Sequence, residues 1–274
     1  MIYKRHHSIE ITLQDYIDYF GTLSNAKRSC FNIGAGIWRH EAWTNIDLPP
    51  QSEEFAKIQA PCIFHDLVRS DDLPILDNSA EFIYASHVIE HLPDVYANRL
   101  FVSACKAMKQ GGVFRVTTGP DADTDYAALL RRDKNWWYFY DDADYASAIM
   151  NLGPLSLTDR WLLHLATPRS NYSSAPCSRK YGSMEVEALI DKYGGDPVMV
   201  RNILTDGLEF NIHHPGDHLS WWNAEKLIRQ LQNAGFGLIE KSAYGQSRSS
   251  FMRDLSHFDT TYPQISLYVE AVKV

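Results

Sequence analysis

The sequence lacks any apolar run of about 18 residues, the length that a membrane-spanning helix requires. Its N-terminal stretch MIYKRHHSIEITLQDY carries positive charge but has no continuous apolar segment behind it, so it does not read as a signal peptide. The four cysteines are widely spaced and form no CxxC pair, which favours a reducing compartment over a disulfide framework. These absences predict a soluble, cytoplasmic protein with no membrane contact.

An excess of positive charge is also absent. The 274 residues carry a formal net charge of -8, whereas a protein that wraps nucleic acid usually presents a basic face, so no nucleic-acid partner is expected. Hydrophobic residues make up 45% of the chain, which suffices for a full core without a metal or a disulfide. The length suits one large domain, or a domain with a substantial insertion.

Short apolar runs separated by helical patterns predict an α/β fold. Strand patterns occur at 30–33, 43–46, 62–64, 81–85, 113–117, 237–241 and 265–272. Helical spacing occurs at 9–26, 93–108 and 221–233, and Gln110-Gly111-Gly112 is expected to stop the second of these helices. This alternation predicts a Rossmann-like, doubly wound sheet of seven mostly parallel strands. The strict alternation in ISLYVEAV predicts that the C-terminal strand is antiparallel and near an edge.

Residues 120–217 do not follow this rhythm. They contain an aromatic cluster at 136–140, an apolar segment at 161–165 and a polar loop at 170–180. We expect a mostly helical insertion over the carboxyl edge of the sheet, which serves as a lid or substrate region within a single domain of residues 1–274.

A glycine turn follows the strand pattern at 30–33. Glycine has no side chain, so Gly34-Ala35-Gly36 can bring bare backbone against a ligand. In open α/β sheets such a turn lies at the carboxyl ends of the strands, where ligands bind. A glycine pair alone indicates only a nucleotide-like ligand.

A carboxylate narrows the choice of ligand. Asp47 ends the second strand pattern, where it can accept both hydroxyls of a ribose. A dinucleotide site calls for a third glycine that opens a helix, and Arg39 or His40 stands near that position instead. The residues therefore favour a cofactor with a ribose and no phosphate, such as S-adenosylmethionine.

Several segments resemble the motifs of class I S-adenosylmethionine-dependent methyltransferases, in the order that this family uses them. They are GAGIWRHEAWTNIDLP, IFHDLVRSDDLPILDNSAEFIYASHVIEHLPD and MKQGGVFRVTTGPD. The stretches HLSWWNAEKLIRQLQNAGF and SRSSFMRDLSHFDTTYPQISLYVEAVK are similar to a bacterial subgroup, of the methyltransferase type 11 kind, that modifies cell-surface polysaccharides and sugar precursors. The resemblance covers residues 30–120 and 213–273 and leaves the insertion between them unmatched.

The resemblance implies S-adenosylmethionine as the cofactor and S-adenosylhomocysteine as its product. Within it, Asp47 would hold the ribose hydroxyls, Asp66 would contact the adenine amino group, and His87 would lie near the reactive methyl. Many relatives carry cysteine where this chain has Ala35, and either small residue fits. The residues expected to bind the cofactor are Asn32, Gly34, Ala35, Gly36, Asp47, Leu48, His65, Asp66, Leu67, Ser86 and His87.

Histidines supply the candidate general bases, because imidazole titrates near neutral pH. His87 and His218 are the candidates for removing a proton from a hydroxyl acceptor, and His218 matches a position in the relatives' pattern. His91 is either a further base or a packing residue beneath the cofactor. Asp121 either faces the substrate or is a turn residue after Pro120.

Two patterns raise the question of a metal. HVIEH at 87–91 matches the H-x-x-E-H pattern of inverted zinc peptidases, but it follows the strand EFIYAS and runs into Leu92-Pro93 rather than lying on a helix. His213, His214 and His218 cluster without a carboxylate or cysteine at a ligand spacing. No metal site is therefore expected.

The sequence thus predicts a methyltransferase for a small-molecule acceptor. O-methylation of a sugar, a sugar-nucleotide or another cell-surface polysaccharide precursor is the first choice. The alternatives are a methyltransferase that acts on RNA or protein, and a non-catalytic protein that binds a nucleotide cofactor. The insertion leaves open whether the chain forms a homodimer.

Overall fold

The computed structural model describes residues 9–137 and 155–274. The chain divides into two compact units, which we describe separately. The sheet unit consists of the residues up to Ile89, Asp94–Thr118 and Ala224–Val274. The helical unit consists of Glu90–Pro93 and Gly119–Asn223, and the expected insertion at 120–217 falls within the second of these ranges.

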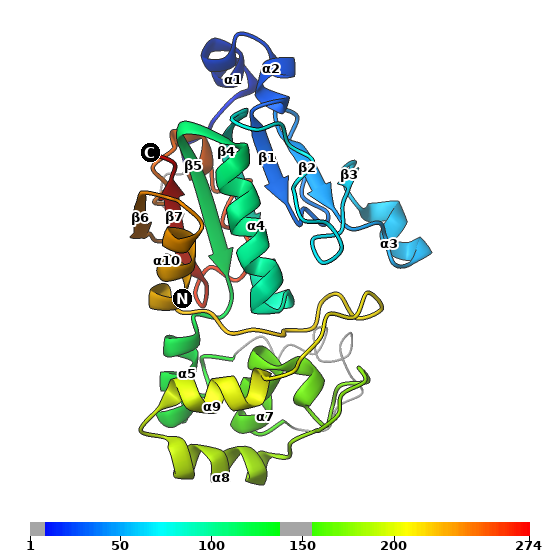
Figure 1. Ribbon diagram of the computed structural model, residues 1–274, viewed down its shortest axis with the longest axis vertical. Coiled ribbons are helices and arrows are strands. Elements are labelled where there is room, and N and C mark those ends of the chain that lie inside the picture. The colour runs from blue at the N-terminus through cyan, green and yellow to red at the C-terminus, as the bar shows by residue number, and fades with distance from the viewer. Residues whose placement is uncertain (1–8, 138–154) are drawn as a thin grey trace. The chain divides into compact units, whose positions relative to one another are not determined.

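A seven-stranded sheet forms the centre of the sheet unit (Figure 1). Its strands run in the order β3-β2-β1-β4-β5-β7-β6. Their bounds are β1 (Cys30–Ile33), β2 (Thr44–Asp47), β3 (Ile63–Phe64), β4 (Ala80–Ser86), β5 (Met108–Thr118), β6 (Leu238–Lys241) and β7 (Leu267–Val272). All pairs among β1 to β5 are parallel, and β7 is antiparallel to both of its neighbours. The predicted Rossmann-like sheet with an antiparallel C-terminal strand is confirmed.

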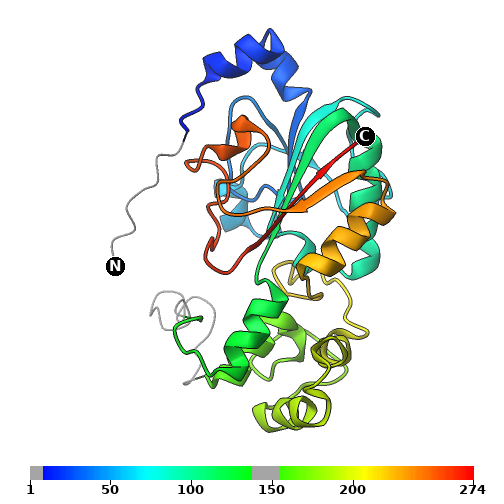
Figure 2. The ribbon, with the colours of Figure 1, turned by 90° about the vertical axis from the view of Figure 1, so that its left-hand side faces the viewer.

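Different segments cover the two faces of this sheet. The helices α4 (Asp94–Ala107) and α10 (Ala224–Asn233) contact each other and lie on one face (Figure 2). The chain between β6 and β7, which contains the 3-10 turn η4 (Ser250–Arg253), lies on the other face. There Phe251, Met252 and Phe258 join a buried cluster with Tyr16 and Trp43. The C-terminal part of the chain thus completes the core of the sheet unit.

The single helix expected at 9–26 is wrong, because the chain forms two short helices there. They are α1 (Leu13–Phe20) and α2 (Leu23–Lys27). Gly21 ends α1 with a φ of 81°, a left-handed conformation that glycine adopts without a steric penalty. Thr22 then caps α2 by accepting a hydrogen bond from the Asn25 N–H. A third short helix, α3 (Glu53–Ile58), follows β2.

The expected stop at Gln110-Gly111-Gly112 is also wrong. α4 ends at Ala107 and β5 begins at Met108, so the two glycines lie inside the strand. Gly111 has a φ of 81°, and the pairing of β5 with β4 shifts its register between Ala80 and Phe82. A glycine within a strand is typical of such an irregularity.

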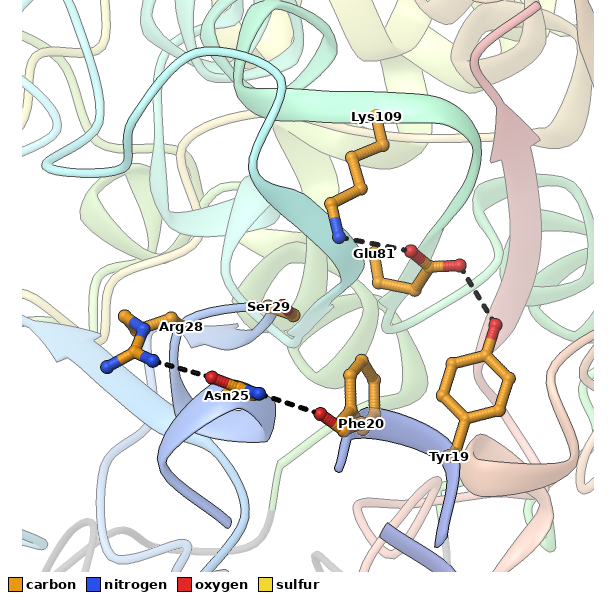
Figure 3. A pocket seen from close by; sticks show the side chains of 7 residues that line it. All are labelled: Tyr19, Phe20, Asn25, Arg28, Ser29, Glu81 and Lys109. Atoms are coloured by element: carbon orange, nitrogen blue, oxygen red, sulfur yellow. Dashed lines mark hydrogen bonds and ion pairs between the residues drawn. The ribbon is translucent and has the colours of Figure 1, made fainter. Parts of the chain in front are cut away.

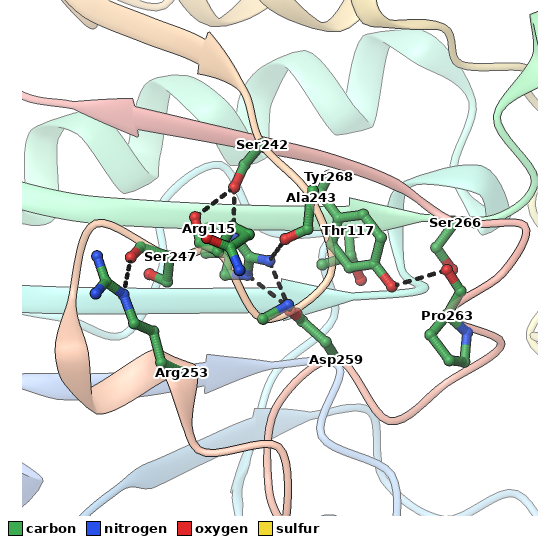
Figure 4. A network of polar contacts seen from close by, with 12 residues as sticks. Arg115, Thr117, Ser242, Ala243, Ser247, Arg253, Asp259, Pro263, Ser266 and Tyr268 are labelled. Carbon is green, nitrogen blue, oxygen red and sulfur yellow. Dashed lines mark hydrogen bonds and ion pairs between the residues drawn. The ribbon is translucent and has the colours of Figure 1, made fainter. Parts of the chain in front are cut away.

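Arg115 of β5 ties the C-terminal strands to the parallel part of the sheet (Figure 4). Its fully buried side chain forms ion pairs with Asp259 at 2.6 Å and with Glu270 of β7 at 3.0 Å. The guanidinium also donates hydrogen bonds to Ser242 Oγ and to the Ala243 carbonyl oxygen. Residues 267–271 of β7 are all buried, and the ion pair with Arg115 compensates the buried charge of Glu270.

The described residues of the helical unit form mainly short helices. They are α5 (Ala122–Leu130), α7 (Leu157–Leu165), the 3-10 turn η3 (Thr167–Arg169), α8 (Ser183–Tyr193) and α9 (Pro197–Thr205). In the aromatic cluster, Trp137 is fully buried and Trp136 donates its Nε1–H to Asp125 Oδ1 at 2.6 Å, while residues 138–140 lie outside the described residues. Trp137 is therefore a core residue rather than a stacking platform for a ligand.

No helix within 9–137 or 155–274 has the length and apolar content needed to cross a membrane.

Candidate functional site

The strand order creates a switch point at the carboxyl ends of β1 and β4. These strands are neighbours in the sheet; from β1 the order continues outward to β2 and β3, and from β4 it continues outward to β5. In open α/β sheets, ligands bind in the crevice that such a reversal leaves at the carboxyl ends of the strands. Gly34 follows β1 directly and Ser86 ends β4, so both lie at this point.

The glycine turn after β1 is shaped by close contact on one side and open space on the other. Gly34 has a φ of 67°, and a Cβ placed on it would come within 2.3 Å of Val88 Cγ2. Gly36 has a φ of 56°, and no described atom lies within 4 Å of the position that its Cβ would take. Ala35 between them is buried, as is Asn32 in β1. The turn can therefore present bare backbone to a ligand at Gly36, as the sequence predicts.

Asp47 connects the end of β2 to this turn. Its carboxylate accepts a hydrogen bond from the Gly36 N–H at 2.6 Å and another from the Leu48 N–H at 2.7 Å. The structure therefore brings together the predicted Gly36, Asp47 and Leu48. The carboxylate fixes the backbone of the turn, and its lone pairs beyond these two bonds suit hydroxyl donors.

The connection between β1 and β2 contains no helix. Residues 34–43, all of which the structure describes, form turns and irregular backbone only. A dinucleotide places its pyrophosphate at the N-terminus of a helix that follows the first strand. This chain offers no such helix end after β1.

The predicted residues His65, Asp66 and Leu67 follow β3. His65 donates its backbone N–H to the Asp47 carbonyl oxygen at 2.8 Å, which places this segment beside the end of β2. Burial lowers the pKa of His65. Asp66 Oδ1 accepts hydrogen bonds from the backbone N–H groups of Val68 and Arg69 at 2.8 and 3.2 Å. Asp66 thus stabilises its own turn, and its contact with an adenine stays a prediction.

Ser86 and His87 at the end of β4 are held by residues that the sequence did not single out. Thr117 of β5 donates a hydrogen bond to Ser86 Oγ at 2.8 Å. The His87 Nε2 lies 3.1 Å from the Thr261 carbonyl oxygen and 2.9 Å from Ser266 Oγ. A carbonyl oxygen can only accept, so Nε2 carries the proton and the lone pair of the neutral ring lies on Nδ1. No local sequence pattern could predict these partners, because they are far from Ser86 and His87 in the sequence.

The other predicted catalytic residues belong to the helical unit. Asp121 caps α5 by accepting a hydrogen bond from the Asp123 N–H at 3.1 Å, which is the turn role that the sequence allowed for it. His91 and His218 lie together, with ring centroids 4.9 Å apart. Burial, with a smaller contribution from His91, lowers the pKa of His218 to about 3. His218 is therefore neutral at physiological pH.

A pocket of about 450 Å³ lies at the opposite edge of the sheet (Figure 3). It is lined by residues at the amino ends of the strands, including Ser29 before β1, Glu81 in β4 and Lys109 in β5. Glu81 accepts a hydrogen bond from the Tyr19 hydroxyl at 3.1 Å and pairs with Lys109 at 3.5 Å. This pocket is separate from the carboxyl edge that carries the glycine turn.

Comparisons with known proteins find solved structures of distant similarity. No protein-family model matches the chain, and no curated protein matches it either. An S-adenosylmethionine dependent methyltransferase from Mesorhizobium loti is 15% identical over 89% of this chain and 90% of its own, with a TM-score of 0.41. A SAM dependent methyltransferase from Archaeoglobus fulgidus is 13% identical over 95% of this chain and 91% of its own, with a TM-score of 0.39. Similarity this low says nothing about the acceptor.

Proposed function

We propose that the protein is a class I S-adenosylmethionine-dependent methyltransferase. The proposal depends on the arrangement at the switch point between β1 and β4. There the carboxylate of Asp47 holds the glycine turn at Gly36, and no helix lies between that turn and β2. A carboxylate at this place suits ribose hydroxyls, and open space at Gly36 suits close approach of a ligand. The missing helix end counts against a pyrophosphate and hence against NAD. The resemblance of the motifs to class I methyltransferases points the same way.

The residues assigned to the cofactor would each contact a different part of it. Gly34, Ala35 and Gly36 would lie against the methionine and ribose, with Asp47 on the ribose hydroxyls. Asp66 would contact the adenine, and Ser86 and His87 would line the space near the methyl group. When bound, S-adenosylmethionine supplies an activated methyl group, so the protein must align the acceptor, exclude water and, for a hydroxyl, accept a proton.

His87 is the base that we assign in the sheet unit. Its Nε2 faces the Thr261 carbonyl, so a neutral His87 would accept the proton of an acceptor hydroxyl at Nδ1. The hydrogen bonds to Thr261 and Ser266 hold the ring orientation and stabilise the imidazolium that forms. An acceptor that is already a carboxylate or an amine would not require this step.

For the acceptor we propose a small molecule, with a hydroxyl of a sugar, a sugar-nucleotide or another polysaccharide precursor as first choice. The resemblance of the C-terminal stretches to a subgroup with such substrates supports this choice. The net charge of -8 weighs against RNA, since nucleic-acid binding depends on neutralising phosphates. The four cysteines are all free thiols, which agrees with work in a reducing cytoplasm.

Transfer of a labelled methyl group separates the acceptor classes. The full chain would be incubated with methyl-labelled S-adenosylmethionine and, in parallel, with sugar-nucleotides, total RNA and a protein extract. We expect label in the sugar-nucleotide fraction, reduced strongly by His87→Ala with cofactor binding retained. Label in RNA or protein would instead support a macromolecular acceptor. Cofactor binding without transfer to any fraction would support the non-catalytic alternative.

A further inference from the structure

A compact group of residues of the types that bind metal ions lies within the helical unit. Glu90, His91 and His218 each present a ligand atom, and these three atoms lie within 4.8 Å of one another. Glu90 is almost fully buried, at 2% exposure, and both histidines are partly buried. The cluster combines two imidazoles with one carboxylate, and none of the three residues is exposed.

The backbone holds the two parts of the cluster together. Glu90 and His91 lie in the one-turn 3-10 helix η1 (Ile89–His91), and His218 precedes an irregular segment. The Glu90 carbonyl oxygen accepts hydrogen bonds from the N–H groups of Leu219 and Ser220 at 2.7 and 3.2 Å. These main-chain contacts hold the backbone next to His218 beside Glu90.

Contacts with backbone carbonyls fix the tautomer of both histidines. His91 Nδ1 lies 3.2 Å from the Asp217 carbonyl oxygen, and His218 Nδ1 contacts the His164 carbonyl oxygen. Because a carbonyl oxygen can only accept, Nδ1 of each ring carries the proton and Nε2 carries the lone pair. A backbone carbonyl that orients the second ring nitrogen in this way is the usual support of a metal-bound histidine.

The carboxylate is oriented as well. Glu90 Oε1 accepts a hydrogen bond from the Gly119 N–H at 3.1 Å. Ligating carboxylates are commonly hydrogen-bonded by an outer group in this manner.

We propose that Glu90, His91 and His218 bind a divalent transition-metal ion, for which Zn²⁺ is the reference. Tetrahedral Zn²⁺ with bonds of about 2.0–2.2 Å places its ligands roughly 3.3 Å apart, so side-chain movements of roughly 1 Å close the cluster around an ion. Two histidines and one carboxylate leave a coordination position open for an oxygen ligand. This site goes beyond the proposed function. It combines Glu90 and His91 of the HVIEH pattern with His218 of the second histidine group, and neither His87 nor the His213–His214 pair belongs to it.

The test measures metal binding directly, in the tag-free full chain stripped with a chelator. Zn²⁺ would be titrated by calorimetry, and Co²⁺ by its visible absorption spectrum, which reports coordination by nitrogen and oxygen. We expect one ion per chain. Removing a group that only orients a ligand typically weakens metal binding roughly 10–100-fold. Glu90→Gln and His218→Ala change the ligands themselves, so each should weaken binding by at least about tenfold. Glu90→Gln keeps an acceptor for the Gly119 N–H, which preserves the local fold.

His213→Ala is the matched control, since His213 is an exposed histidine in the same loop. We expect this variant to bind Zn²⁺ like the wild type. The proposal is overturned if the wild type binds no more Zn²⁺ than the Glu90→Gln, His218→Ala double variant, or if His213→Ala loses as much affinity as His218→Ala. Binding of S-adenosylmethionine to the metal-free protein is a separate measurement, so failure of either proposal is distinguishable from failure of the other.

Discussion

Gly34 shows how strongly a single position at the switch point is constrained. Its φ of 67° lies in the left-handed region, and Val88 Cγ2 would stand 2.3 Å from a Cβ. We expect Gly34→Ala to lower the free energy of unfolding by about 2–4 kcal/mol, because backbone strain of about 1–2 kcal/mol adds to overpacking of similar size. Unfolding in urea, followed by circular dichroism, measures this loss.

Gly111→Ala is the control for the strain alone. Gly111 has a φ of 81° in the same unit, but no described atom lies within 4 Å of the position of its Cβ. This substitution should therefore cost only about 1–2 kcal/mol. Equal losses in the two variants would show that contact with Val88 does not constrain the turn.

His40 gives the sheet unit a dependence on pH. Burial, with a smaller effect of His257, lowers the pKa of His40 to about 4. Its Nδ1 accepts a hydrogen bond from the Ala42 N–H at 3.1 Å, which a proton on that nitrogen would abolish. The unfolded chain takes up this proton below its ordinary pKa of 6.5, while the native state does not until about pH 4. His40 therefore stabilises the fold above about pH 6.5, and this contribution is lost as the pH falls toward 4.

His40→Asn tests this dependence. We expect the wild type to lose more stability than the variant between about pH 7 and pH 4.5, so that the difference between their free energies of unfolding shrinks with acidification. Urea unfolding at several pH values provides the measurement. A difference that stays constant over this range would rule out a role for His40 protonation.

Among the elements, β5 and β7 depend on the buried ion pairs of Arg115. Replacing one partner of a buried pair leaves an uncompensated charge, which typically costs about 3–5 kcal/mol. Arg115→Met would leave Asp259 and Glu270 in this position, so we expect a loss of that size in the free energy of unfolding. Arg248→Met is the control, because Arg248 pairs with Glu240 at 41% exposure of each side chain and should contribute about 0–1 kcal/mol. Similar losses in the two variants would contradict the role of Arg115.

The elements also show what local sequence patterns can and cannot predict. The parallel strands were found because each is a short apolar run that ends at a turn. The leading helix was predicted as one piece because the apolar spacing continues across Gly21, although the glycine there takes a φ of 81°. The alternation in ISLYVEAV predicted an antiparallel strand near an edge. It did not show that Glu270 is buried, because the fold alone brings Arg115 beside it.

At the scale of the whole molecule, the sequence predicted those site residues that the fold class alone brings together. Gly34-Ala35-Gly36 and Asp47 lie at the carboxyl ends of adjacent strands, so the fold class alone places them together, and the structure joins them through the Gly36 N–H. The Glu90, His91 and His218 cluster was missed because His218 is far from the other two residues in the sequence. Contacts of Leu219 and Ser220 with Glu90, and of Asp217 with His91, bring the two segments together. The division of the chain into two units depends on long-range contacts of the same kind.

Equilibrium binding of cofactors tests the central claim most directly. The full chain would be titrated by calorimetry with S-adenosylmethionine, S-adenosylhomocysteine and NAD, together with Asp47→Asn and, as a control, the exposed Asp77→Asn. An amide at position 47 cannot accept from both the Gly36 and Leu48 N–H groups as the carboxylate does.

We predict saturable binding of both sulfur compounds at one site per chain and no binding of NAD. Asp47→Asn should weaken the affinity at least about tenfold, or 1.4 kcal/mol, and Asp77→Asn should leave it unchanged. Binding of NAD without binding of either sulfur compound, or no heat with any of the three, would contradict the assignment.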